Sequence, residues 1–204
     1  MTQFEIKDGV AIIPEGMTEI PFRAFINCED LTTVVIPDSV TCIVNAAFYG
    51  CSSLTEIVIP NSVTSIGAGA FSHCSSLKNI VIPNSVTQIG YNAFGFCTSL
   101  TNIVIPNSVT SIGDRAFCCA PGRKLVIRNI RKLVTENEPT TVKNASSLTS
   151  VTLPESLTEL GKDVFHGCEK LETIYVPTTK ANFYREHLPE TLHDKIVEFE
   201  PEQK

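Results

Sequence analysis

The chain has 204 residues, 43% of them hydrophobic, and a formal net charge of −6, which is the composition of a soluble globular protein. No run approaches the roughly 18 apolar residues of a membrane span. The first residues, MTQFEIKDG, lack the basic and apolar regions of a signal peptide. We therefore expect no membrane span, and a chain that is cytoplasmic as given or already trimmed.

The charged residues are unevenly distributed along the chain. Between Ile57 and Gly113 the only Asp, Glu, Lys or Arg is Lys78. A nucleic-acid footprint needs several Lys and Arg side chains on one face. We therefore expect no nucleic-acid partner.

The chain begins with residues 1–14, which we expect to form a hairpin cap. Asp8 and Gly9 separate two apolar stretches, and an Asp-Gly pair is typical of a two-residue hairpin turn. Because the ends of a repeat protein expose its core and need caps, this hairpin would complete the first coil.

Residues 15–177 carry a repeat of 23 residues. The nonamer IPNSVTSIG occurs at 59–67 and 105–113, and IPNSVTQIG lies between them at 82–90. Fixed periods of 20 to 50 residues indicate a solenoid. The first residues of the aligned Ile-Pro pairs and their equivalents are Ile13, Ile36, Ile59, Ile82, Ile105, Leu153 and Val176.

Each unit predicts one short strand followed by a tight coil. The segment LxxIxI, for example Leu54, Ile57 and Ile59, alternates apolar and variable positions at its end, as in a short strand with one buried face. Pro60 has no amide hydrogen to donate and suits the end of a strand, and the Asn and Ser that follow favour a turn. The rest of the unit is too short for more than one turn of helix, around GxxAF. Stacked units would share one core and pair their strands in a parallel sheet.

The pattern of IP, SVTxIG, AF and C with a period near 23 closely resembles the BspA-like leucine-rich repeat family, and residues 36–117 carry it without a gap. The resemblance covers nearly the whole chain. It implies a repeat solenoid, a horseshoe-like right-handed superhelix with a parallel β-sheet on the concave face and mostly irregular or short helical segments on the convex face. It also implies a protein-binding or adhesive surface, often on a cell surface or secreted, although the specific ligand does not transfer.

The repeat becomes irregular at about 118–147. This segment keeps strand-like Leu125 and Ile127 but loses the proline, glycine and phenylalanine of the unit. It also contains five basic residues in ten positions, namely Arg123, Lys124, Arg128, Arg131 and Lys132. One interpretation is a drifted repeat with a solvated loop. The other is a second contact site, because irregular insertions in solenoids often carry binding.

Residues 178–204 abandon the period, and we expect them to form a C-terminal cap. Ala181 to Leu188 could form a short helix that Pro189 ends, with a last strand from Ile196 to Phe199. Both ends read as caps, so we expect residues 1–204 to form a single domain.

Five of the eight cysteines follow the repeat, at Cys28, Cys51, Cys74, Cys97 and Cys168. A free cysteine behaves as a small hydrophobe, so we expect reduced thiols in the core; the alternative is cross-linking between stacked neighbours. Cys118 and Cys119 are adjacent, so one of them could be exposed and oxidisable. Because no Cys or His set has the spacing of a zinc site, we expect no metal and no cofactor.

The chain carries none of the common catalytic motifs. GxSxG, GxxxxGK, HExxH and GxGxxG are absent, and no histidine can be paired with Cys118 or Cys119. Four glycines recur with the repeat, which indicates a backbone requirement for tight turning rather than a phosphate cradle: Gly67, Gly90, Gly113 and Gly161. We therefore expect no enzymatic activity.

The predicted strands offer one candidate binding surface. If Ile57 and Ile59 point inward, Glu56 and Val58 point outward, and the same alternation holds in each unit. It predicts a row of Val35, Val58, Val81, Val104, Val126, Thr152 and Tyr175, beside a row of Thr33, Glu56, Asn79, Asn102, Lys124, Ser150 and Thr173. Valine could stand here simply as a good strand former. The other interpretation is a docking surface, because contiguous exposed apolar strips tend to mark interaction sites.

We expect a non-enzymatic scaffold, a monomer, that binds a protein partner through the concave sheet. The basic segment with Arg123, Arg128, Arg131 and Lys132 is a possible second contact. Two alternatives remain open, a cell-surface adhesin or antigen that binds host matrix proteins, and, less favoured, a thiol-dependent enzyme.

Overall fold

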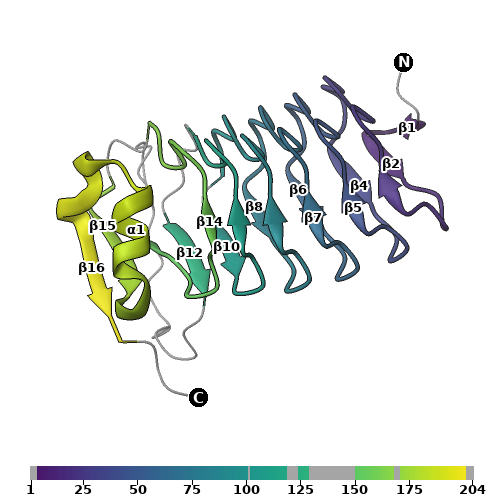
Figure 1. The fold of residues 1–204 in the computed structure, drawn as a ribbon. Helices are drawn as coiled ribbons and strands as arrows, with labels where there is room; N and C mark the ends of the chain where they lie inside the picture. The colour runs from purple at the N-terminus through teal and green to yellow at the C-terminus, as the bar shows by residue number, and fades with distance from the viewer. Residues whose placement is uncertain (1–3, 101, 119–123, 129–149, 168–170, 201–204) are drawn as a thin grey trace, which may run out of the picture.

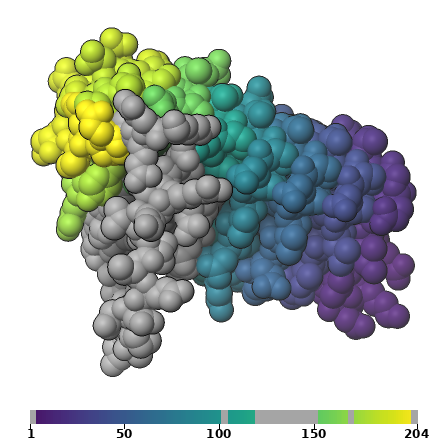
Figure 2. Space-filling view, turned by 90° about the horizontal axis from the view of Figure 1, so that it is seen from below, coloured from purple at the N-terminus to yellow at the C-terminus, as the bar shows by residue number. Residues whose placement is uncertain are grey.

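The computed structural model describes residues 4–100, 102–118, 124–128, 150–167 and 171–200. In these residues the chain forms a β-solenoid of about seven turns with parallel strands and little helix (Figure 1). The coils that run from the N-terminal end to the teal part of the chain pack side by side (Figure 2). The predicted solenoid is confirmed.

The main sheet of the solenoid contains one strand from each coil. Its strands are β2 (Val10–Ile12), β4 (Thr33–Val35), β6 (Glu56–Val58), β8 (Asn79–Val81), β10 (Asn102–Pro106), β12 (Lys124–Arg128), β13 (Ser150–Thr152), β15 (Thr173–Pro177) and β16 (Ile196–Phe199). They pair in parallel from β2 to β4 and from β6 to β16. Between the two parts, the amide of Thr55 donates to the carbonyl of Thr32 at 3.3 Å, so the face continues across the gap.

A second parallel sheet lies along another side of the coils, where only an irregular segment was expected. Its strands have two residues each: β3 (Glu19–Ile20), β5 (Cys42–Ile43), β7 (Ser65–Ile66), β9 (Gln88–Ile89), β11 (Ser111–Ile112) and β14 (Glu159–Leu160). In SVTxIG the buried residues, such as Val63 and Ile66, lie three apart. Because a strand alternates with a period of two, such short strands leave no recognisable pattern in the sequence.

The core consists of columns in which each residue meets its own copies in neighbouring coils. Six phenylalanine rings stack in one such column, with ring centroids 5.1 to 5.6 Å apart: Phe4, Phe25, Phe48, Phe71, Phe94 and Phe117. We call this column the phenylalanine ladder. The identical nonamers recur because each fills the same place in successive coils.

The recurrent glycines are explained by close approach of neighbouring coils, and not by the turn itself. A Cβ atom at Gly90 would lie 2.6 Å from the amide nitrogen of Ala68, and one at Gly113 would lie 2.5 Å from that of Tyr91. The positive φ angles occur two residues later, at Asn92 (50°) and Arg115 (55°). The sequence interpretation of these glycines therefore identified a backbone constraint but gave the wrong reason for it.

Both ends of the solenoid carry the elements that the sequence predicts. At the N-terminus, β1 (Ile6–Lys7) pairs antiparallel with β2 through a turn in which Asp8 and Gly9 both have positive φ, as a type I′ hairpin requires. The division of the chain into a single domain stays a prediction.

At the C-terminus the chain forms η1 (Thr178–Lys180), α1 (Ala181–His187), η2 (Glu190–Lys195) and β16 (Figure 1). Among the described residues, helix occurs only in this segment. The two short 3-10 helices were not expected.

The described residues of the irregular unit, 124–128, form a strand of the main sheet only. In the main sheet β12 lies between β10 and β13, whereas in the second sheet β11 pairs directly with β14. β12 pairs with β10 along the whole length of β10. The strand β10 therefore continues through Pro106, which pairs with Arg128. The proline is the last residue of β10, and Pro177 is likewise the last residue of β15. The expectation that proline ends the strand therefore holds in both coils.

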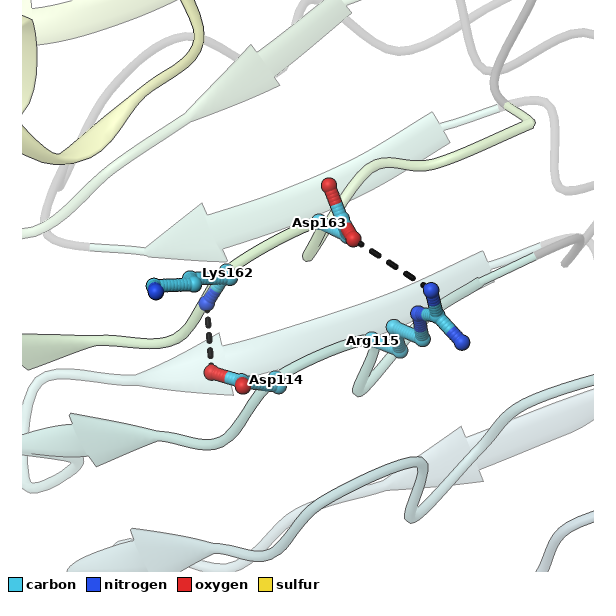
Figure 3. Close-up of polar contacts among 4 residues, drawn as sticks. All are labelled: Asp114, Arg115, Lys162 and Asp163. Atoms are coloured by element: carbon cyan, nitrogen blue, oxygen red, sulfur yellow. Dashed lines mark hydrogen bonds and ion pairs between the residues drawn. The ribbon is translucent and has the colours of Figure 1, made fainter.

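Polar contacts join the coils of β11 and β14 where they meet (Figure 3). A carboxylate oxygen of Asp114 accepts a hydrogen bond from the amide of Lys162 at 2.5 Å, and Arg115 forms an ion pair with Asp163 at 3.5 Å. Both contacts span 48 residues in the sequence. The solenoid is thus continuous on this side without the irregular unit.

Candidate functional site

The outward positions of the main sheet align in two rows that cross the strands. The strand pairing, with the Thr55–Thr32 hydrogen bond between β4 and β6, places the following residues in one row, which we call the outer row: Ile12, Val35, Val58, Val81, Val104, Val126, Thr152, Tyr175 and Val197. Neighbouring strands in a sheet lie about 4.8 Å apart. The predicted column is therefore contiguous at the level of the backbone.

Three apolar members of the outer row are strongly exposed. Val58, Val81 and Ile12 have exposed fractions of 78%, 70% and 68%, whereas Ile57 and Ile80 are buried. The alternation results from the pleat, which points successive side chains to opposite faces. Large apolar groups thus lie in solvent while the same strands fill the core with their other side chains.

A second row lies beside the outer row, and we call it the polar row. It contains Val10, Thr33, Glu56, Asn79, Asn102, Lys124, Ser150 and Thr173. Within β2, β4, β6 and β8, Glu56 is the only charged residue in either row. The surface over these strands is therefore apolar and nearly neutral.

Three members of the two rows were missed by the sequence analysis. Ile12 precedes Ile13-Pro14 as Val58 precedes Ile59-Pro60, so the alignment could have found it, and Val10 two residues earlier. No such signal exists for Val197, because β16 lies outside the repeat. The pairing of Tyr175 with Val197 adds it to the row.

The basic segment is only partly described. The backbone of β12 places Lys124 in the polar row and Arg128 opposite Pro106 at the end of the strand. Arg123, Arg131 and Lys132 lie outside the described residues. The second contact site stays a prediction.

The cysteine column lies in the core. Cys51, Cys74 and Cys97 are fully buried, and each S–H group donates to a backbone carbonyl of the neighbouring coil at 3.0 to 3.1 Å. Burial disfavours the thiolate, which raises the pKa of Cys51 and of Cys97 to about 12. These thiols are packing residues with little nucleophilic character.

Of the other cysteines named in the sequence analysis, the structure describes Cys28 and Cys118. Cys28 is half-buried and Cys118 is buried, while Cys119 and Cys168 lie outside the described residues. Burial of Cys118 keeps it from a substrate in solution. It therefore offers no support for a nucleophile at this position.

The described residues show no group of three or more His, Cys, Asp or Glu side chains that could hold a metal ion. Within them there is also no helix of the length and apolarity that crossing a membrane requires. His73, which stands beside the cysteine column in the sequence, stacks on Phe96 with ring centroids 4.5 Å apart.

Several solved structures resemble this chain. A leucine-rich repeat protein from T. pallidum is 31% identical, with a TM-score of 0.63, over 90% of this chain and 79% of that protein. A leucine rich cell surface protein from Faecalibacterium prausnitzii is 28% identical, with a TM-score of 0.56, over 84% of this chain and 48% of that protein. This chain therefore spans about half of the second protein's length.

The pneumococcal vaccine antigen PcpA has a TM-score of 0.55 over 82% of this chain and 41% of its own length, and at 20% identity it supports the fold alone. Comparison with curated proteins gives no significant match.

The family described as BspA type leucine rich repeat region matches six copies of its repeat in residues 9–124 and 76–188. Such repeat scaffolds are typical of protein-binding or surface proteins. The 23-residue period, the stacked columns and these matches agree, and the chain belongs to the BspA-type leucine-rich repeat family.

Proposed function

We propose that this protein is a non-enzymatic scaffold, a monomer, that binds a protein partner through the outer row of its main sheet. The observation that carries the proposal is the exposure of Ile12, Val58 and Val81 in one contiguous row. Burying apolar surface is worth roughly 25 cal/mol per Å², so a partner that covers this row gains binding free energy along its whole length.

The chemistry of the surface favours a protein over other classes of partner. Nucleic acids require Lys and Arg side chains, and the only charged residue of the two rows in β2, β4, β6 and β8 is the acidic Glu56. The outer row and the polar row match the apolar core and the polar rim of a protein interface.

Catalysis by a thiol is the least favoured function. The thiolate is the nucleophile, and burial raises the pKa of Cys51 and Cys97 to about 12. Retained function in a Cys118→Ser, Cys119→Ser double variant would exclude the remaining candidates for this role.

The proposal is tested by adding charge to the outer row. In a variant with Val35→Glu, Val58→Glu and Val81→Glu, each partner captured by the wild type in cross-linking pull-downs is expected to bind at least about tenfold more weakly, because burying an unpaired carboxylate is costly. Affinity for a captured partner would be measured by titration.

A matched control variant carries three glutamates in the same coils, each just before a strand of the second sheet. It combines Thr41→Glu, Thr64→Glu and Thr87→Glu, three exposed positions one coil apart. The two variants have the same charge and similar repulsion between glutamates, so the control should bind like the wild type. Equal affinity in all three proteins would contradict the proposal and direct attention to Arg123, Arg128, Arg131 and Lys132.

A second candidate is a cell-surface adhesin or antigen that binds host matrix proteins. It is supported by the similar protein from F. prausnitzii, which is named a cell surface protein. Protease treatment of intact cells that express the full-length gene product would remove the chain if it is surface-exposed and leave it intact otherwise.

A further inference from the structure

A cavity of about 330 Å³ lies between the last regular coil and the C-terminal segment. Val164, Phe165, Leu188 and Leu192 form its apolar lining. Polar residues complete the lining at Asp163, His166, His187 and Thr191. An apolar cavity with a few polar groups is the usual form of a binding site, and this volume is at the small end of the range.

The cavity lies at the C-terminal end of the solenoid, beyond Phe94 and Phe117, the last stacked pair of the phenylalanine ladder. Phe165 occupies the phenylalanine position in the coil of β14, which pairs directly with the coil that contributes Phe117. At the other end of the molecule Phe4 closes the ladder by stacking on Phe25 at 5.1 Å. Leu188, at the end of α1, is a buried side chain that also lines the cavity. Leucine is smaller than phenylalanine and has no ring.

The walls of the cavity are held by polar contacts. The hydroxyl of Tyr184, one turn before Leu188, donates to the carbonyl of Pro154 and fixes α1 against the last coil. The amide of Leu188 donates to the carbonyl of Tyr184 at 2.9 Å, and a ring nitrogen of His193 lies 2.9 Å from the carbonyl of Leu188. A preformed cavity binds without the cost of ordering its walls.

The charge at the rim is largely engaged by other groups. The carboxylate of Asp163 turns toward Arg115 and pairs with it at 3.5 Å (Figure 3). Nδ1 of His187 lies 2.7 Å from the carbonyl of Phe183, and the two rings stack at 4.2 Å. Exposed His166 and Thr191 are left as polar groups at the rim, which suits a ligand with an apolar ring and an attached amide.

We propose that this cavity binds one aromatic side chain of a peptide or protein partner, whose ring packs against Phe165 in the cavity lining. A pair of aromatic rings is worth about 0.5–1.5 kcal/mol beyond area burial. This preference for a planar ring distinguishes the proposal from simple filling of an apolar hole. It does not depend on the function proposed for the outer row.

The test uses the full chain and N-acetyl-phenylalaninamide as the probe, with binding followed by NMR chemical-shift changes. N-acetyl-leucinamide serves as the aliphatic control, and free phenylalanine as the control for a free amino acid. We expect the phenylalanine amide to bind about tenfold or more tightly than either control, with the largest shifts at the residues that line the cavity.

Two variants locate the site. Leu188→Phe fills the cavity from inside, and Thr191→Trp covers it from an exposed position, so at least one is expected to fold. Each should weaken binding of the phenylalanine amide about tenfold or more, while Asn182→Trp, an exposed position on α1 outside the cavity lining, should not.

Three results would overturn the proposal. The first is no binding of the phenylalanine amide, or binding unchanged in the folded variants. The second is equal binding of the leucine amide, which would remove the preference for a ring. The third is tighter binding of free phenylalanine, which would make the ligand a free amino acid instead of a peptide.

Discussion

Cys51, Cys74 and Cys97 occupy one position in three successive coils, and each donates its S–H group to the carbonyl of a phenylalanine 26 residues earlier. A small apolar group with one weak donor fits this place, because the phenylalanine carbonyl already accepts a backbone amide of its own coil and has a second lone pair for the thiol. The column could be predicted from the sequence because it follows the period. The carbonyl partner could not, because it depends on the turn of the coil.

These buried thiols should resist alkylation while the protein is folded. Burial raises the pKa of Cys51 and Cys97 to about 12 and that of Cys74 well above its usual value, and alkylating reagents attack the thiolate. Iodoacetamide at pH 8 should therefore leave all three unlabelled in the native protein. After denaturation without a reductant, intact mass should show eight labels, one for each cysteine.

Rapid labelling of Cys74 in the folded protein, or fewer than eight labels after denaturation, would contradict this assignment.

The same pKa shifts predict that the stability of the fold depends on pH. Because the folded state holds these protons more tightly than the unfolded state, the stability that they contribute is present below pH 9.0 and is lost as the pH rises toward 12. Urea denaturation at several pH values would show a falling midpoint in this window.

Among the elements, the phenylalanine ladder is the most regular, since five ring pairs have interplanar angles of 3 to 22°. Each ring contacts the next coil, so a coil is stabilised by its neighbours more than by contacts within itself. The main-sheet strands and this ladder could be predicted from alternation and period. The second sheet could not, because strands of two residues carry no periodic signal.

Truncation within the ladder should destabilise the solenoid strongly. Phe71 is fully buried between Phe48 and Phe94, and Phe71→Ala is expected to reduce the free energy of unfolding by about 3–5 kcal/mol, because it removes burial and leaves a cavity. Phe96→Ala is the control, since Phe96 is exposed on the surface of the next coil. It should cost roughly 1 kcal/mol or less. Equal losses in chemical denaturation would contradict the role of the ladder.

For the molecule as a whole, the period fixed which residues share the outer row, because in-register stacking brings equivalent positions together. Val35, Val58 and Val81 are exposed as predicted. Their binding role stays a proposal. Val197 could not be predicted because its strand lies outside the repeat, and the cavity beside Leu188 arises from packing between distant segments. The direct pairing of β11 with β14 likewise depends on tertiary structure.

The most direct test of the outer row places a photo-cross-linking amino acid at Val58, with the same residue at Thr64 as the control. Both positions are exposed and lie in one coil. Val58 is on the main sheet, and Thr64 is on the side of the second sheet. Irradiation with the partner identified in the pull-downs should give a covalent complex from position 58 and none from position 64. Cross-linking from position 64 alone, or equally from both, would contradict binding through the main sheet.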